Sequence, residues 1–202
     1  MGHQQALVYS RRPSLVSTMT RVKYRLALTH GRACVDDLPF MQWLIDRGAN
    51  IKARSFLDSS TLSKAIIHGS IDVVHFLLAR EEDVNRGDLL HCAAERKNQD
   101  EGAMLVKDLV EMGAKIDAHR YLHDDALRFR YFSRLGTPLH TACYERNFPV
   151  AKVLLDHGAN IHCKMLLELK ETGPTPLELA VGTGDPRWIN LFMAKNLLDA
   201  RL

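Results

Sequence analysis

The segment Leu-Ile-Asp-Arg-Gly-Ala-Asn-Ile at residues 44–51 returns as Leu-Leu-Asp-His-Gly-Ala-Asn-Ile at residues 154–161. Two looser copies lie between them, Leu-Leu-Ala-Arg-Glu-Glu-Asp-Val at 77–84 and Leu-Val-Glu-Met-Gly-Ala-Lys-Ile at 109–116. The first Leu of each copy falls at 44, 77, 109 and 154, in steps of 33, 32 and 45 residues, and Phe192 takes its place in a fifth copy. A recurring period of this length predicts a repeat architecture in which each copy is one structural unit.

A second shared element precedes these segments. Gly-Thr-Pro-Leu-His-Thr-Ala at 136–142 matches Pro-Thr-Pro-Leu-Glu-Leu-Ala at 174–180, and looser versions occur at 60–65 and 88–93. The Ala that ends this element lies 12 residues before the next first Leu in three copies, but 16 residues before it in the third. The third copy therefore carries four extra residues, which we place around Asn98–Met104.

The fourth copy shows what each unit is expected to fold into. Thr137 suits a helix N-cap and Pro138 suits the first helical turn, where its missing N–H costs nothing. Apolar residues then recur at helical spacing, and Pro149 begins a second apolar stripe. Gly158 follows as the expected left-handed helix stop, and Gly48 and Gly113 occupy the same place in their copies. The pattern predicts a short helix, a turn and a second helix.

These motifs resemble the ankyrin-repeat family over roughly residues 22–196. The resemblance implies an all-α fold: an ankyrin-repeat solenoid of about five stacked helix-turn-helix repeats with an extended inter-repeat insertion. It implies that the histidines at the fourth position of the opening element, His91 and His140, are structural and hydrogen-bond between neighbouring repeats. The small residues Ala65, Ala93, Ala142 and Ala180 would let stacked helices approach closely. The expected divisions are a flexible basic arm at 1–21, repeats at 22–53, 54–86, 87–118, 135–163 and 173–202, and an insertion at 119–134.

The insertion is the most unusual part of the pattern. Ile116 lies 23 residues before Leu139, whereas Ile51 lies only 11 before Leu62. Arginine and aromatic residues interleave there, and these residue types dominate protein-binding hot spots. The structural alternative is that its apolar residues only pin the segment to the stack, and a nucleic-acid contact by base stacking is a further reading. Candidate binding residues in the insertion are Arg120, Tyr121, Arg128, Arg130, Tyr131 and Arg134.

The resemblance also implies binding through the loops between repeats and through the concave face formed by the first helices. Phe56 lies on the second such loop. Thr141, Tyr144 and Glu145 lie on the first helix of the fourth copy, at positions that the resemblance assigns to the concave face, and Tyr144 is the strongest candidate among them.

No pattern predicts an enzyme or a cofactor. A phosphate-binding loop and a Gly-x-Ser-x-Gly elbow are both missing from the sequence, and Gly182-Thr-Gly184 follows a predicted helix, where it is typical of a turn. The four cysteines are scattered without a Cys-x-x-Cys pair, and His157, His162 and Cys163 fall on segments that need not converge. We therefore expect no metal site, no disulfide framework and reduced thiols.

The N-terminal segment differs from the rest in charge. Residues 1–35 hold six basic residues and no acid, although the net charge of the chain is only +3. This composition also fits a mitochondrial transit peptide, but the basic residues continue into the first repeat, which favours a flexible arm. Arg11-Arg12-Pro13-Ser14-Leu15 has the basic-basic-x-Ser-apolar form that basophilic kinases prefer, which makes Ser14 a candidate phosphorylation site.

The sequence thus predicts a non-enzymatic protein–protein interaction module, a scaffold or adaptor for an intracellular partner. We expect it to be monomeric, to reside in the cytoplasm or nucleus, and not to insert into a membrane, because no apolar stretch approaches ~20 residues. One alternative is the recognition part of a larger signalling or enzymatic protein. The second is a nucleic-acid contact through the insertion, which the near-neutral charge beyond residue 35 makes less favourable.

Overall fold

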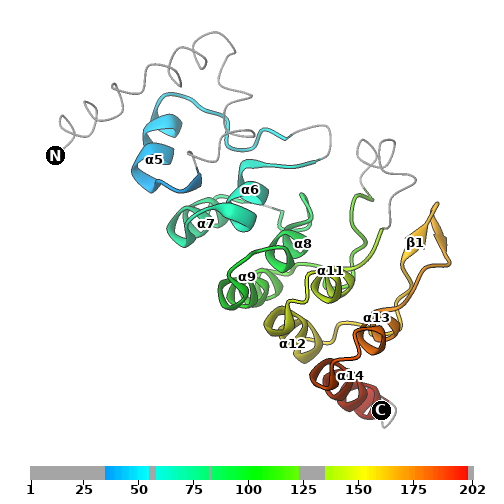
Figure 1. Ribbon diagram of the computed structural model, residues 1–202. Helices are drawn as coiled ribbons and strands as arrows, with labels where there is room; N and C mark the ends of the chain where they lie inside the picture. The colour runs from blue at the N-terminus through cyan, green and yellow to red at the C-terminus, as the bar shows by residue number, and fades with distance from the viewer. Residues whose placement is uncertain (1–34, 55–57, 82, 123–134, 200–202) are drawn as a thin grey trace. The chain divides into compact units, whose positions relative to one another are not determined.

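The structure is a computed structural model that describes residues 35–54, 58–81, 83–122 and 135–199. These residues are mostly helical and divide into two compact units (Figure 1). The first unit contains residues 35–54 and 59–81, and the second contains Asp58, 83–122 and 135–199.

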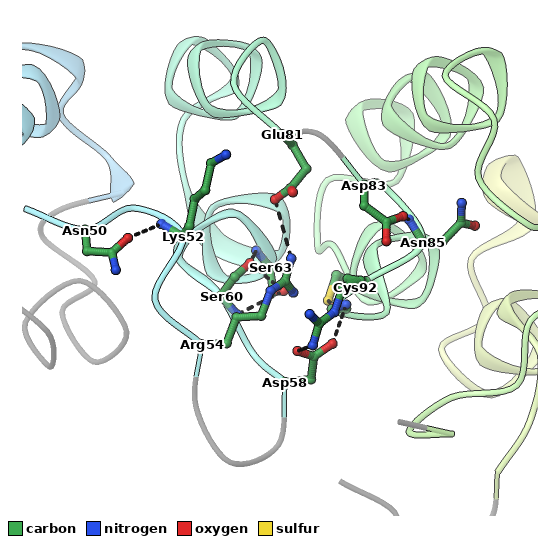
Figure 2. Close-up of polar contacts among 12 residues, drawn as sticks. Asn50, Lys52, Arg54, Asp58, Ser60, Ser63, Glu81, Asp83, Asn85 and Cys92 are labelled. Carbon is green, nitrogen blue, oxygen red and sulfur yellow. Dashed lines mark hydrogen bonds and ion pairs between the residues drawn. The ribbon is translucent and has the colours of Figure 1, made fainter. Parts of the chain in front are cut away.

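The first unit contains three helices, α5 (Leu38–Asp46), α6 (Thr61–His68) and α7 (Ile71–Leu78). Side chains cap each of them by accepting a backbone N–H, as Asp37, Ser60 and Ser70 do at the N-caps. At α6 the Ser60 and Ser63 hydroxyls each accept the other residue's N–H, which completes a capping box (Figure 2). The expected second helix of the first copy is confirmed as α5. The expected first helix of that copy, around Leu26–Leu28, lies outside the described residues.

The core of this unit is apolar and closely packed. Phe40, Met41 and Leu44 of α5 are buried, as are most of the apolar side chains of α6 and α7. Gly69 lies so close to the backbone of Val35 that a Cβ there would sit 2.4 Å from the Val35 carbonyl oxygen. The loop before α6 is held by an ion pair of 3.6 Å between Arg54 and Glu81 (Figure 2).

The second unit contains three consecutive helix pairs (Figure 1). The first helices of the pairs contact one another in chain order, and so do the second helices. Figure 1 shows the two rows, with α8, α11 and α13 on one side and α9, α12 and α14 on the other. The pairs are α8 (Leu89–Ala94) with α9 (Gln99–Glu111), α11 (Pro138–Tyr144) with α12 (Phe148–Asp156), and α13 (Pro176–Gly182) with α14 (Pro186–Asp199).

Small residues let the first helices approach one another. Ala93, Ala142 and Ala180 are completely buried, as the repeat pattern predicts. Between the first two pairs, the buried Asn147 caps α12 by accepting the N–H of Val150, and its amide donates to the carbonyl of Ala94. The Asn147 side chain thus satisfies a backbone N–H at the start of α12 and a backbone carbonyl at the end of α8, although Asn147 and Ala94 are 53 residues apart in the sequence.

The helix ends follow the glycine pattern. Gly48, Gly113 and Gly158 have φ of +82°, +92° and +91°, which confirms the expected left-handed stops. Asn196 replaces glycine in the last copy, and α14 continues past it to Asp199. The four extra residues of the third copy lengthen α9, which has 13 residues against 9 in α12.

A short β-hairpin in the second unit was not expected from the sequence. β1 (Leu166–Leu167) pairs antiparallel with β2 (Lys170–Glu171) around Glu168 and Leu169, which both have positive φ. Leu135 forms an isolated bridge to Leu166 on the other side of β1. The described residues are thus mostly helical, and the inter-repeat segment satisfies some of its backbone groups by strand pairing.

Candidate protein-binding site

Two buried histidines fix the loops above the first helices of the second unit. The ring of His91 hydrogen-bonds through Nε2 to the carbonyl of Gly136 at 3.1 Å, and that of His140 through Nε2 to the carbonyl of Pro174 at 3.0 Å. His140 Nδ1 accepts the N–H of Thr137, so Nε2 carries the proton that reaches Pro174. Both histidines therefore link one copy to the segment before the next, as the family resemblance implies.

Burial keeps both rings uncharged. It lowers the pKa of His91 from 6.5 to about 3, with a further contribution from the charge of Arg120. Burial likewise lowers the pKa of His140 to about 4, although the hydrogen bond to Pro174 opposes this shift. At neutral pH the two imidazoles are neutral hydrogen-bonding groups.

The base of the insertion is fastened at several points. The N–H of Arg120 donates to the carbonyl of Gly136, so the described ends of the segment meet. The N–H of Tyr121 donates to the Asp88 carboxylate at 3.2 Å, and the ring of His119 hydrogen-bonds to the carbonyl of Lys164. The Tyr121 contact ties the loop before α11 to the start of α8, and the His119 contact ties it to the segment before β1.

The side chain of Arg120 reaches back to the end of α8, where it forms a hydrogen-bonded ion pair with Glu95. Burial lowers the pKa of Arg120, but the hydrogen bond and charge of Glu95 outweigh it, so the pKa lies above its ordinary value. The guanidinium also lies 4.7 Å from the ring centroid of Tyr121. Its Nε is buried without a hydrogen-bond partner among the described residues.

Arg120, Glu95, Gly136 and His140 line a hollow of about 270 Å³, which we call the central hollow. Its described lining comes from α11 and the residue after it, from the residue after α8, and from the loops before α11 and before β1. The residues that line it are Glu95, Arg120, Gly136, His140, Thr141, Tyr144, Glu145 and Met165. A hollow of this size is at the lower limit of a small ligand site and also fits one side chain of a bound protein.

The most exposed large side chain in the lining belongs to Tyr144, whose relative exposure is 46%. Thr141 is half-buried one turn earlier on α11, and Glu145 is exposed directly after the helix. Among the described lining residues, Glu95 and Glu145 are the acids, Arg120 is the one cation and His140 is neutral. These described residues together carry a net charge of about −1 at neutral pH.

The structure brings together four of the residues selected from sequence. Arg120, Thr141, Tyr144 and Glu145 line the central hollow, and Tyr121 lies against Arg120. Glu145 is the C-cap of α11 and not part of the helix itself. Phe56, Arg128, Arg130, Tyr131, Arg134 and Ser14 lie outside the described residues.

Sequence reasoning missed Glu95 and Met165 as members of the site. Aligning the copies places Glu95 at the position of Tyr144 in the preceding copy, and this alignment could have identified it. Met165 has no comparable signal, because it lies in the unpredicted segment before β1.

The other described histidines and cysteines make separate contacts, and Cys163 Sγ lies 3.9 Å from His119 Nε2. His162 hydrogen-bonds to Asn196, whereas His157 bonds to the carbonyl of Val153 on its own helix. Burial raises the pKa of the Cys143 thiol to about 12, so this thiol is not a nucleophile at neutral pH. Within residues 35–54, 58–81, 83–122 and 135–199, no three His, Cys, Asp or Glu side chains are grouped to hold a metal ion. No helix in these ranges has the length and apolar character needed to cross a membrane.

A comparison with protein families agrees with the geometry of the second unit. Residues 136–166 match the model of the ankyrin repeat, a span that contains α11, α12 and the start of β1. Ankyrin repeats generally mediate protein–protein interaction, and the family is typically a non-enzymatic interaction module. The matched span also supplies six of the eight described residues that line the central hollow.

Proposed function

We propose that this chain is a non-enzymatic interaction module that binds another protein through the central hollow. The observation that carries the proposal is the exposed Tyr144, which stands beside a hollow whose walls are fixed by hydrogen bonds between copies. An aromatic anchor on a rigid backing gives contact area at low entropic cost. The chain would act as a scaffold or adaptor.

The rigidity of the walls supports this proposal. The carbonyl of Gly136 accepts from both the ring of His91 and the N–H of Arg120, and Leu135 is bridged to Leu166. A partner that enters the hollow would therefore meet a surface that is already ordered. Preorganised surfaces lose less entropy on binding, which favours specific recognition.

We extend the proposal to the whole chain as a solenoid of about five repeats, with the divisions expected from the sequence. The helix pairs α6–α7, α8–α9, α11–α12 and α13–α14 support four of them, and α5 supports the second half of the first. The insertion at 119–134 would add contacts beside the hollow, because its first described residues, Arg120 and Tyr121, lie at the hollow's edge.

The central hollow argues against a nucleic-acid partner at this site. Two carboxylates against one guanidinium repel phosphate groups, whereas nucleic-acid surfaces are basic. The basic residues that suggested such a contact, Arg128, Arg130 and Arg134, lie outside the described residues.

Affinity capture from an extract of the source cells tests the proposal. Thr141→Arg places a bulky charged side chain in the hollow, and Met104→Arg places the same side chain on the exposed surface of α9. We expect the wild-type chain and the Met104→Arg variant to retain one protein that the Thr141→Arg variant loses, with the three melting temperatures alike. Equal capture by all three would exclude the hollow.

A second variant separates the hollow from the insertion. Residues 123–134 are replaced by a short Gly-Ser linker, which leaves Arg120 and its contacts in place. Retention of the captured protein by this variant assigns recognition to the hollow alone. Loss of the protein, with folding intact, assigns an essential part of the contact to the insertion.

A further inference from the structure

We infer that the central hollow receives a basic side chain, lysine or arginine, from an extended segment of the partner protein. This inference rests on the proposed function and specifies the chemistry of the partner. It is carried by three features of the described lining residues: their net charge, the pairing of Arg120 with Glu95, and the position of an aromatic ring beside an acid.

The net negative charge of the described lining residues favours a positively charged side chain of the partner. Glu95 and Glu145 contribute two negative charges and Arg120 one positive charge, and the buried His140 is neutral at pH 7. A cation entering the hollow would bring its total charge to about zero. An aspartate or glutamate side chain would instead bring the total to about −2, which opposes binding.

Arg120 does not cancel this preference, because its charge is already engaged. Its guanidinium is paired with Glu95 within the wall, and its side chain is only 20% exposed. Glu145, the C-cap of α11, is exposed, and no ion pair of Glu145 is found among the described residues. The acid that remains available to a partner is therefore Glu145.

Tyr144 precedes Glu145 and offers a ring that is 46% exposed. A guanidinium or ammonium group is attracted to the face of an aromatic ring, and the methylene groups of lysine and arginine pack well against such a ring. The Tyr144 ring thus suits the methylene groups of one basic side chain, and the Glu145 carboxylate suits its charged group.

Arg120 also indicates what accompanies that side chain. Its Nε–H is buried beneath the lining and has no acceptor among the described residues. A buried donor without an acceptor is unfavourable, and we expect a backbone carbonyl of the bound segment to accept from it. An uncharged acceptor satisfies this donor without adding to the negative charge of the hollow.

The test selects peptides from a random 12-residue phage-displayed library on the immobilised full-length chain, followed by synthetic copies of the enriched sequences. We expect the enriched peptides to share a lysine or arginine whose replacement by glutamate abolishes binding. Glu145→Gln should weaken binding up to about fivefold, and Glu145→Lys up to about thirtyfold, the range of one exposed ion pair lost and then reversed. Glu111→Gln, which removes an exposed acid from α9, is the matched control and should change nothing.

The outcomes separate this inference from the proposed function. Enriched peptides that lack a basic residue, or that bind the Glu145→Lys variant as well as the wild type, overturn the inference. If Thr141→Arg still abolishes their binding, the hollow remains a protein-binding site of another chemistry. Failure to enrich any peptide that Thr141→Arg excludes also overturns the inference, and the capture experiment then decides the proposed function.

Discussion

Arg120 and Glu95, which are 25 residues apart in the sequence, form a partly buried, hydrogen-bonded ion pair. The pair fastens the first residues of the insertion to the end of α8, and its two side chains are only 20% and 24% exposed. Removing the carboxylate would leave a largely buried guanidinium without its partner, because Nε is already unpaired. The pair is therefore part of the framework that shapes the central hollow.

Glu95→Gln is expected to lower the free energy of unfolding by about 1–3 kcal/mol, the usual cost of losing a hydrogen bond to a partly buried charged group. Urea denaturation of the variant measures this loss. The double variant Glu95→Gln, Arg120→Gln should cost less than the sum of the single changes, because neither charge is then left alone. Strict additivity would show that the pair does not couple the loop to α8.

The two buried histidines predict a stability that depends on pH. Each ring binds a proton more readily in the unfolded chain, where its pKa is near 6.5, than in the folded one, where it is about 3 for His91 and about 4 for His140. Protonation therefore favours unfolding, and the stabilising contribution present above pH 6.5 is lost as the pH falls toward 4. Between the folded and unfolded pKa values, the free energy of unfolding falls by up to about 1.4 kcal/mol per pH unit for each histidine.

Urea midpoints measured between pH 4 and 8 test this dependence. His140→Gln should be less stable at pH 7 but should show a shallower fall in stability on acidification. His157→Gln, which changes an exposed ring, is the control and should keep the slope of the wild type. An unchanged slope in His140→Gln would contradict the buried neutral ring.

Gly136 is required by close contacts at the wall of the hollow. A Cβ at this position would lie 2.7 Å from the Cβ of His140 and 3.1 Å from the terminal methyl carbon of Met165. Gly136→Ala should therefore destabilise the chain by about 1–3 kcal/mol. Gly182→Ala is the matched control, because nothing lies within 4 Å of a Cβ there, and it should be neutral or slightly stabilising in a thermal melt.

Ala142 reports on the stacking of the first helices. It is fully buried on α11, where a larger side chain has no room, so Ala142→Phe should cost about 1–3 kcal/mol by overpacking. The same change at the exposed Ala194 of α14 should leave the melt almost unaltered. Equal melts for the two variants would mean that the predicted repeat register is wrong.

The helices could be predicted from the sequence because each carries local signals. Asp37 and Pro39 mark the start of α5, and the positive φ of Gly158 confirms the stop inferred from the repeated glycine. The hairpin could not be predicted in this way. Its turn residues, Glu168 and Leu169, adopt positive φ without the Asn or Gly that usually indicates such a turn.

The candidate site was predictable only where it follows the repeat. Thr141 and Tyr144 occupy positions that the resemblance assigns to a binding face, and both line the hollow. The pairing of Arg120 with Glu95 depends on how the insertion's base folds back, and no local pattern encodes that contact. The repeat pattern thus predicted which residues of α11 lie together, whereas the Arg120–Glu95 ion pair is known only from the structure.

The most direct test of the central claim is site-specific photocrosslinking. A benzoylphenylalanine placed at Tyr144 reports on the hollow, and one placed at Met104 reports on the exposed surface of α9. In extract from the source cells, the account predicts one crosslinked protein from position 144 that is missing from position 104 and that excess unlabelled wild-type chain displaces. Crosslinks of equal yield from both positions, or a product that the wild-type chain does not displace, would contradict it.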